Sequence, residues 1–236
     1  MSTTPTSRSG EYAARGDYHR HLDPHWSYAP IYERKMRWVD ACLENVPSTA
    51  RILDAGAGEG AVVARYRESG RVIEGVDGAY DSPLVRKADL RSLPYEDGAF
   101  GVVLFLDVLE HIPLLDQPAV LSEIVRVLSD DGVLLMSVPN LAHAHSRLRF
   151  LLSGKLTRTS AVDRHPGDRP VAEFLELLAE AGLSVDYRGG IFPTLPIAFR
   201  AVNRAPHRFG WLVGFLDAVV PFVSLRFLAT IRAHKR

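Results

Sequence analysis

The sequence predicts an α/β fold in which a parallel sheet carries helices on both faces. Segments typical of strands alternate with segments typical of helices from residue 51 to residue 188, and this order indicates a parallel sheet. The run FGVVLFLD at 100–107 is almost continuously apolar, as parallel strands buried on both faces are. The chain has 236 residues, 47% of them hydrophobic, which is enough for one sizeable core, so we expect one domain.

Six strands are expected where short apolar runs are bounded by glycine, proline or acids. They span residues 51–56, 71–77, 100–107, 133–139, 183–189 and 225–233. Four helices are expected where apolar residues recur at helical spacing, at 30–47, 60–70, 116–132 and 170–182. In the third helix we expect Asp116 to cap the start and Gly132 to close the end.

The formal net charge is zero, and the chain holds a single cysteine, Cys42. Nucleic-acid-binding domains usually carry a clear basic excess, so we expect no nucleic-acid partner. One cysteine allows neither an intramolecular disulfide nor a thiolate zinc cluster. Residues 1–26 are expected to form a flexible lead. Its start, MSTTPTSRSG, lacks the apolar core of a signal peptide, so a cytoplasmic protein is the simplest expectation.

Three acids, Asp54, Asp77 and Asp107, stand at the ends of predicted strands. Ligands of open parallel α/β sheets bind beyond the carboxyl ends of the strands. We therefore expect these three carboxylates to line one crevice, whatever the ligand is.

The turn after the first strand, DAGAGEGA at 54–61, fits two patterns. It matches the loose dinucleotide pattern G-x-G-x-x-A, with Asp77 at a suitable distance to bind a ribose. It also matches acid-x-G-x-G-x-G, in which Asp54 precedes the first glycine. This acid would repel a pyrophosphate. It suits a ligand with a cationic end, such as S-adenosylmethionine, which carries an ammonium and a sulfonium and no phosphate.

Several motifs, in order, resemble those of the class I S-adenosylmethionine-dependent methyltransferases. LDAGAGEG is similar to their first motif, and GVD to their ribose-binding strand end. KADLRSLPYEDGAFGVVLFLDVLEHI is similar to a run of the small-molecule branch that includes the ubiquinone-biosynthesis methyltransferases, and EIVRVLSDDGVLLMSVPN resembles the helix and strand that follow. The resemblance implies a Rossmann-like, doubly wound, mostly parallel seven-stranded sheet with an antiparallel last strand. It also implies a single domain over 27–236 with helical cap insertions at about 140–168 and 193–223.

The resemblance assigns S-adenosylmethionine-binding roles to residues on the loops that follow the predicted strands. They are Asp54, Gly56, Ala57, Gly58, Gly60, Asp77, Gly78, Asp89, Leu90, Leu106 and Asp107. The glycine turn would pass under the methionine end, whose amino-acid group Asp54 would organise. Asp77 would accept hydrogen bonds from the ribose hydroxyls, and Asp89, with Leu90 beside it, would meet the adenine edge. The pair at 106–107 would flank the sulfonium.

One stretch departs from the family pattern. Only eleven residues separate Asp77 from Asp89, where the family usually fits a helix and a strand. We therefore expect that helix to be a turn or absent, and the adenine pocket to be more open.

Methyl transfer requires alignment of a nucleophile and often removal of its proton. Six residues are candidates for that work: Asp107, Glu110, His111, His143, His145 and His165. Glu110, His111 and His165 are the predicted catalytic residues, and histidine is a suitable base near neutrality. Two interpretations stay open for the first two of these residues: they perform the chemistry, or they hold the loops of the cofactor pocket.

A metal site is a further alternative, although no metal is predicted. Asp107-x-x-Glu110-His111 resembles an acid-x-x-Glu-His arrangement of relatives that bind a divalent ion, and His165 lies where a further ligand could come from. Such an ion would acidify a substrate hydroxyl.

The first cap, at 140–168, begins with an amphipathic stretch in which we expect His143 and His145 on an exposed helix face. The family often places a lid in the N-terminal segment, which is rich in aromatic residues and histidine. Tyr28 and Tyr32 are the residues to test there.

The second cap, at 193–223, is apolar and basic. It is either a packed helical cap or an amphipathic patch that contacts an anionic membrane or admits a lipid-like substrate. Four residues would carry that contact: Arg204, Arg208, Trp211 and Phe215. The apolar run at 209–229 approaches the length of a membrane span, but three residues interrupt it: Asp217, Pro221 and Arg226. We therefore expect no transmembrane helix.

The sequence thus predicts an S-adenosylmethionine-dependent methyltransferase of a small-molecule acceptor. A hydroxyl on a quinone-, lipid-, sugar- or natural-product-like molecule is the expected methyl acceptor. Two other classes stay open: a dinucleotide-dependent oxidoreductase, and a non-catalytic scaffold of the same fold. The sequence leaves the oligomeric state open.

Overall fold

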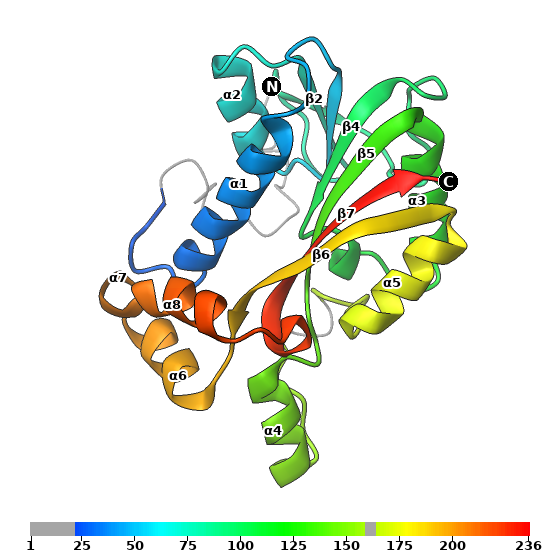
Figure 1. The fold of residues 1–236 in the computed structure, drawn as a ribbon. Helices are drawn as coiled ribbons and strands as arrows, with labels where there is room; N and C mark the ends of the chain where they lie inside the picture. Colours follow the sequence, from blue (N-terminus) through cyan, green and yellow to red (C-terminus); the bar gives the residue numbers. More distant parts are fainter. Residues whose placement is uncertain (1–21, 159–163) are drawn as a thin grey trace, which may run out of the picture.

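Seven strands form one sheet in the computed structural model, which describes residues 22–158 and 164–236. They are β1 (Ile52–Ala55), β2 (Ile73–Asp77), β3 (Val85–Lys87), β4 (Phe100–Leu106), β5 (Leu128–Pro139), β6 (Leu183–Pro193) and β7 (Arg226–Lys235). Their order across the sheet is β3-β2-β1-β4-β5-β7-β6. The first five strands run parallel, and β7 lies antiparallel between β5 and β6 (Figure 1). This is the fold that the resemblance implied.

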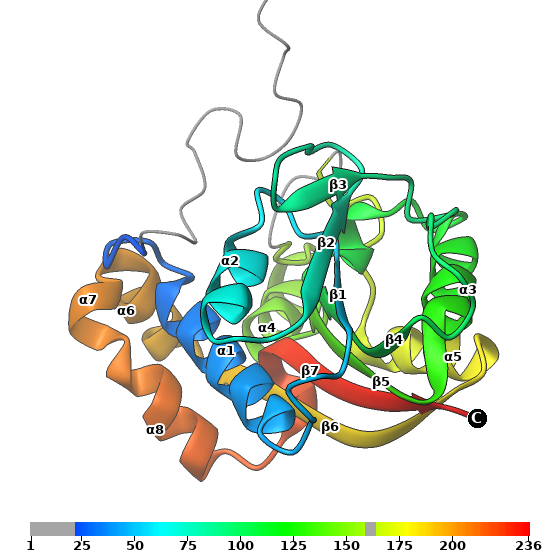
Figure 2. The ribbon, with the colours of Figure 1, turned by 90° about the horizontal axis from the view of Figure 1, so that it is seen from above.

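Helices cover both faces of the sheet, as Figure 2 shows from above. They are α1 (Ala29–Leu43), α2 (Ala61–Glu68), α3 (Gln117–Val127), α4 (Ala144–Ser153), α5 (Val171–Glu180), α6 (Pro196–Arg204), α7 (Pro206–Phe209) and α8 (Trp211–Val219), with short 3-10 turns at Leu109–His111 and Val223–Leu225. On one face α1 and α2 share a core with the strands, in which Met36 and Val63 are buried. On the other face α3 and α5 share a second core, centred on Phe174.

The strand order reverses between β1 and β4, which place their carboxyl ends next to each other. Open α/β sheets bind their ligands at such a switch point. The glycine turn follows β1, and Asp107 follows β4. The topology therefore brings the two most informative motifs of the sequence to one place.

Two predicted helix ends are wrong. The helix expected over 116–132 ends at Val127, and the chain enters β5 at Leu128. Phe100 pairs with Leu128 and Val102 with Val133, so Gly132 belongs to a bulge in β5 and does not close the helix. The helix expected over 30–47 ends at Leu43. Asp116 holds the capping position of α3, but its side chain makes no capping hydrogen bond.

The expected departure between β2 and β3 is present. Residues 78–84 form bends and turns with no helix, and β3 is only three residues long. The crevice is therefore flanked on this side by a short loop.

The caps lie at one end of the molecule (Figure 1). Residues 193–223 form α6, α7 and α8, which share a small core with α1 and with the ends of β6 and β7. Asp217 anchors this unit, since it accepts hydrogen bonds from Arg34 Nε and from the backbone N–H of Phe192, each at 2.7 Å. Of the predicted lead at 1–26, residues 1–21 lie outside the described residues. Among the helices described, none has the length and apolar character needed to cross a membrane.

Candidate functional site

The turn that follows β1 is built from glycines in a backbone conformation that other residues rarely adopt. Gly56, Gly58 and Gly60 have φ angles of 84°, 55° and 88°. A side chain at Gly56 would collide with Val108, and one at Gly60 would meet Leu84 Cβ at 2.8 Å. The turn therefore needs glycine both for its φ angles and for its close packing against Val108 and Leu84.

A cavity of about 860 Å³ lies beside this turn, and we call it the glycine cavity. Seven of the eleven residues that the sequence assigns to the cofactor line it: Gly56, Gly58, Asp77, Gly78, Asp89, Leu90 and Asp107. Ala57 and Gly60 complete the turn, in which Ala57 N–H donates to Val76 O at 2.9 Å. Leu106 lines a neighbouring cavity. The structure thus gathers most of the predicted set around one space.

Asp54 does not line the glycine cavity, contrary to the expectation that all three strand-end acids share one crevice. Its side chain belongs to the buried end of β1 and is only 3% exposed. Its Oδ2 atom meets no hydrogen-bond donor from the described residues. Burial, and then the charge of Asp77, raise the pKa of Asp54 to about 7. A buried carboxylate oxygen that lacks a partner, next to the glycine turn, fits a ligand with a cationic end.

Asp77 ties the glycine turn to the end of β2. Its carboxylate accepts hydrogen bonds from the backbone N–H groups of Gly58 at 2.9 Å and Ala79 at 2.8 Å. Farther along the cavity, Leu90 is buried, whereas Asp89 is exposed and forms an ion pair with Arg91. The pKa of Asp89 is lowered by its hydrogen bonds with Arg91. The predicted ribose residue, Asp77, is therefore held in place by backbone N–H groups, whereas the predicted adenine residue, Asp89, lies at the surface.

Asp107 is held by three side chains directly after β4. Tyr28 Oη at 2.6 Å and Lys35 Nζ at 2.8 Å both donate to Oδ2, and the Ser137 hydroxyl donates to Oδ1. Burial alone would raise the pKa of Asp107, but Lys35, Ser137 and Tyr28 outweigh it and hold the pKa below its usual range. Asp107 has a φ of 57°, and the described residues contain one other non-glycine residue with positive φ, Phe192. Such strain persists where surrounding contacts enforce it.

Lys35 is the functional residue that the sequence analysis missed. It is 4% exposed, on the face of α1 that also buries Tyr32, Met36 and Val39. The sequence did carry a signal for a buried ion pair, namely a lysine on the apolar stripe of a predicted helix, because lysine is almost never fully buried without a partner. Lys35 Nζ also lies 5.1 Å from the centre of the Tyr32 ring, which adds cation–π attraction.

A second cavity, of about 530 Å³, adjoins the first, and we call it the histidine cavity. The three predicted catalytic residues, Glu110, His111 and His165, all line it. Gly56, Asp107 and His111 line both cavities. The two spaces therefore meet at the glycine turn and at the end of β4, with His111 at the junction.

The orientation of His111 is set by the loop before α5. Its Nδ1 lies 3.0 Å from the carbonyl oxygen of Arg164. A carbonyl can only accept, so Nδ1 carries the hydrogen, and in the neutral ring Nε2 carries the lone pair. The ring of His165 packs edge-on against that of His111, with centroids 4.6 Å apart, and His165 Nδ1 lies 3.4 Å from Asp168 Oδ1.

Glu110 is 1% exposed, and its Oε2 atom meets no hydrogen-bond donor from the described residues. Burial, and then the charge of Asp107, raise the pKa of Glu110 well above its usual value. These effects favour the protonated acid, which is a hydrogen-bond donor. Of the two neighbours, His111 is therefore the better base near neutrality.

A buried clamp joins the two loops that carry the histidines. Gly167 N–H donates to Glu110 O at 3.0 Å. The Gln117 amide, fully buried, donates to Leu109 O and Gly167 O, each at 3.0 Å. A side chain at Gly167 would collide with the carbonyl of Ile112. The segment around His165 is thus fixed against the 3-10 turn that carries His111.

The expectation of an exposed face for His143 is wrong. His143 is fully buried at the start of α4, because Thr194 from the end of β6 covers it and lies 2.7 Å from its Nδ1. Burial, and then the charge of His145, lower the pKa of His143 to about 4. His145 is half-buried and stacks on Phe199 of α6. Neither residue lines the glycine or the histidine cavity.

No three histidine, cysteine, aspartate or glutamate side chains within residues 22–158 and 164–236 are arranged to hold a metal ion. Asp107, the first acid of the acid-x-x-Glu-His pattern, forms its ion pair with Lys35.

Comparisons with known proteins identify the family of the chain. The family model described as "Methyltransferase domain" matches residues 20–187, more than half of the chain. A probable S-adenosylmethionine-dependent methyltransferase of Mycolicibacterium smegmatis is 33% identical over 153 residues, which cover 60% of this chain and 54% of that protein. A ubiquinone biosynthesis O-methyltransferase of Paraburkholderia xenovorans is 29% identical over 134 residues, covering 48% of this chain and 55% of that protein. The chain spans about half the length of the curated relatives it matches.

Solved structures share the fold. The PH0226 protein of Pyrococcus horikoshii aligns with 93% of this chain and 99% of its own, with a TM-score of 0.58 and 15% sequence identity. At that identity the similarity concerns the fold alone.

Proposed function

The chain belongs to the methyltransferase-domain family, as a class I S-adenosylmethionine-dependent methyltransferase, and from this membership we propose that it methylates a hydroxyl group of a small molecule. The predicted family and its cofactor, S-adenosylmethionine, are thereby confirmed. The acceptor hydroxyl is our proposal, and it is supported above all by the position of His111 at the junction of the two cavities.

The residues of the glycine cavity fit the cofactor. Gly56 and Gly58 line the cavity without a side chain. The oxygen of Asp54 that has no partner among the described residues suits the ammonium group, directly or through water. Asp77 stands on the cavity wall, where it can accept hydrogen bonds from ribose hydroxyls. When bound, the cofactor supplies an electrophilic methyl group on a sulfonium.

His111 is proposed as the general base. Its Nδ1–H is directed to the Arg164 carbonyl, so Nε2 is the atom that accepts the proton of the acceptor hydroxyl as that oxygen becomes the nucleophile. His165, whose ring packs edge-on against that of His111, would hold the base in place. Correct placement of the base relative to the reacting oxygen lowers the activation free energy of the transfer substantially.

Glu110 and the Lys35–Asp107 pair are proposed to hold and orient the acceptor. The side chain of Glu110 lies in the wall of the histidine cavity, where a protonated acid can donate to an oxygen of the acceptor. Lys35 and Asp107 line the same cavity and neutralise each other. Trp26, Ile31 and Phe227 add apolar surface to a lining that is mostly polar, so the cavity suits the hydroxylated part of an acceptor.

The test is multiple-turnover transfer of a labelled methyl group from S-adenosylmethionine to a panel of hydroxylated quinones, lipids and sugars. We expect label on oxygen in at least one class, and a loss of rate in His111→Gln. Label found only on nitrogen or carbon, or a rate unchanged in His111→Gln, would contradict the proposed acceptor or the proposed base. Binding of cofactor without turnover on any acceptor would favour a scaffold.

A further inference from the structure

Large apolar side chains are exposed mainly on one part of the described surface. Of the sixteen large hydrophobic residues that are exposed there, twelve lie in 148–156 or 195–222. The most exposed of them are Ile197 at 87%, Leu151 at 80% and Leu152 at 76%. We call the surface formed by residues 144–158 and 195–222 the cap face. A concentration of exposed apolar side chains of this kind marks an interaction surface.

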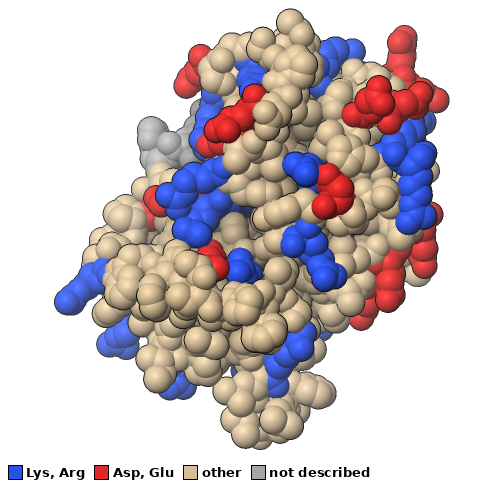
Figure 3. Space-filling view, in the orientation of Figure 1, with Lys and Arg blue, Asp and Glu red and all other residues tan. Residues whose placement is uncertain are grey.

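The cap face is nearly free of acids. Described residues 140–158 contain four cations and no acid: Arg147, Arg149, Lys155 and Arg158. Residues 193–216 contain three arginines and no acid: Arg200, Arg204 and Arg208. Asp217, just beyond, has a side chain only 6% exposed and is paired with Arg34. In Figure 3, the lower end of the molecule, over α4 and α6, shows blue side chains among tan ones.

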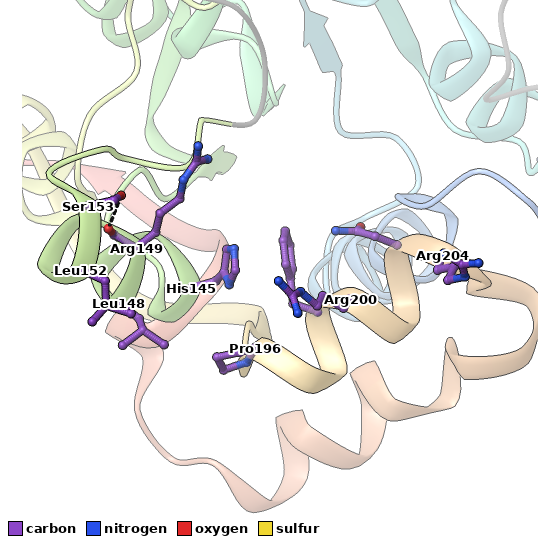
Figure 4. A pocket seen from close by; sticks show the side chains of 10 residues that line it. His145, Leu148, Arg149, Leu152, Ser153, Pro196, Arg200 and Arg204 are labelled. Carbon is purple, nitrogen blue, oxygen red and sulfur yellow. Dashed lines mark hydrogen bonds between the residues drawn. The ribbon is translucent and has the colours of Figure 1, made fainter.

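A groove of about 980 Å³ runs between α4 and α6 in the cap face (Figure 4). Leu148 and Leu152 line it from α4, and Pro196 lines it from α6. Arg149 and Arg200 stand on opposite sides. Burial, and then the charges of these two arginines, lower the pKa of the groove residue His145. The groove is thus apolar along its wall and positive at its rim.

The groove adjoins the proposed acceptor site. Phe199 and Asn203, successive turns of α6, line both the groove and the histidine cavity. These two side chains therefore stand between a molecule in the groove and the cavity that His111 lines.

We propose that the cap face docks on an anionic lipid bilayer, and that the groove receives the apolar tail of an acceptor drawn from that bilayer. The acceptor is then an amphipathic lipid whose hydroxylated head reaches the histidine cavity while its tail lies between α4 and α6. The identity of the acceptor rests on the proposed function, whereas the contact with the bilayer does not.

The chemistry of the cap face fits a bilayer. The apolar side chains of α4 and Trp211 of α8 can enter the boundary between headgroups and acyl chains, as those of interfacial helices do. Arg204 and Arg208 precede Trp211 in the sequence by a few positions and can contact lipid phosphates. Described residues 140–158 and 193–216 add no acid that an anionic surface would repel, and exposed Glu33 of α1, which lines a pocket with Trp211, stands next to Arg34 and Arg37 in that lining.

The test is co-sedimentation of the full chain with vesicles of phosphatidylcholine and with vesicles of an equal mixture of phosphatidylcholine and phosphatidylglycerol. We expect binding to the anionic vesicles that weakens at high salt. The double variant Leu151→Glu with Leu152→Glu should bind at least about tenfold more weakly, because two apolar side chains that would be buried in the bilayer are lost. Arg204→Glu with Arg208→Glu should lose on the order of tenfold or more.

The matched control is Leu114→Glu with Leu115→Glu, which places the same two changes at side chains that are 44% and 94% exposed outside the cap face. It should bind anionic vesicles as the unchanged chain does. S-adenosylhomocysteine affinity, measured on every variant, shows that the fold is retained. Absence of binding to anionic vesicles, equal binding to neutral ones, or equal loss in the control would overturn the bilayer contact. A dimer that Leu151→Glu with Leu152→Glu dissociates would also overturn it, since the cap face would then bind a second copy.

A fluorescent long-chain fatty acid probes the groove separately. We expect it to bind the unchanged chain and to bind Leu148→Asp about tenfold more weakly, with no change in Leu115→Asp. Failure of the probe to bind, together with normal S-adenosylhomocysteine affinity, would refute the groove and leave the methyltransferase proposal standing. Vesicle and probe binding by a chain that does not bind S-adenosylhomocysteine would refute the proposed function instead.

Discussion

Lys35 Nζ of α1 lies 2.8 Å from Asp107 Oδ2 at the end of β4, across 72 positions of sequence. The contact fastens the N-terminal helix to the strand end where the two cavities meet. Tyr28, one residue before α1, donates to the same oxygen. The N-terminal segment is therefore part of the site wall, in the region where the resemblance implied a lid.

Removal of Lys35 is expected to destabilise the fold. Lys35→Met keeps most of the apolar stem and leaves Asp107, whose side chain is 20% exposed, charged and without its cationic partner. This costs roughly 1–3 kcal/mol, less than for a fully buried charge. The additional change Asp107→Asn should recover much of that loss. Urea unfolding of both single variants and of the double variant measures the coupling. Arg51→Met, which breaks an exposed pair with Glu74, is the control and should cost less than about 1 kcal/mol. An equal loss of unfolding free energy in Lys35→Met and Arg51→Met would show that the Lys35–Asp107 pair stabilises the fold no more than an exposed pair does.

Asp54 is expected to oppose stability and to favour binding. Its pKa is raised to about 7 by burial and then by Asp77. The folded chain then binds a proton that the unfolded chain has lost, so stability falls as the pH rises from about 4 to 7. Asp54→Asn should remove this contribution and be more stable near pH 8 by up to about 2–4 kcal/mol.

The same Asp54→Asn variant should bind S-adenosylhomocysteine roughly tenfold to a hundredfold more weakly, because a charged hydrogen bond is lost. Unfolding at about pH 5 and pH 8, with calorimetric titration at each pH, checks both effects. A variant that loses stability near pH 8, or that keeps full affinity, would refute the role of Asp54 at the ammonium group.

His111→Gln should lower kcat by roughly a hundredfold to ten-thousandfold, the usual contribution of a general base. Glutamine keeps a hydrogen-bonding group and has no basic nitrogen, so S-adenosylhomocysteine affinity should change only a few-fold. His234→Gln, in an exposed pair with Asp186, is the matched control and should keep full activity. A general base loses activity when it is protonated, so a pH–rate profile with the same acidic limb in the unchanged enzyme and in His111→Gln would assign the base to another group.

Gly167→Ala should reduce turnover without a matching loss of cofactor binding. The added methyl group would collide with the Ile112 carbonyl and disturb the Gln117 clamp, at a cost of roughly 1–3 kcal/mol. The loop that positions His165 and orients His111 would then shift. Gly101→Ala is the control, because its methyl group would find Ala50 at an ordinary 3.6 Å. A kcat equal to that of Gly101→Ala would show that the clamp does not position the histidines.

The parts of the site that follow strands were predictable from the sequence, because a strand pattern and its carboxyl end are local features. Asp77 and Asp107 lie at such ends, and topology alone brings them to one cavity. Asp54 has the same pattern but lies deeper, since side-chain burial at a strand end depends on neighbours distant in sequence. Whether the predicted cofactor and catalytic residues act as assigned stays a prediction.

The contacts between distant segments were not predictable. The partner of Lys35 depends on the rotation of α1 about its own axis. The spacing of the apolar residues defines this rotation only to within about one residue. His143 was misplaced for the same reason: its burial depends on Thr194, 51 positions away. The bulge that ends α3 early arises from pairing of β5 with β4 and has no strong local signal.

The most direct test is calorimetric titration of the purified chain with S-adenosylhomocysteine and, in parallel, with NADH. A glycine turn beside the buried carboxylate of Asp54 predicts micromolar binding of S-adenosylhomocysteine and none of NADH, whose pyrophosphate Asp54 would repel. Binding of NADH alone would contradict the proposed function and favour a dinucleotide-dependent oxidoreductase. Binding of neither ligand would contradict it as well and leave a scaffold of the same fold.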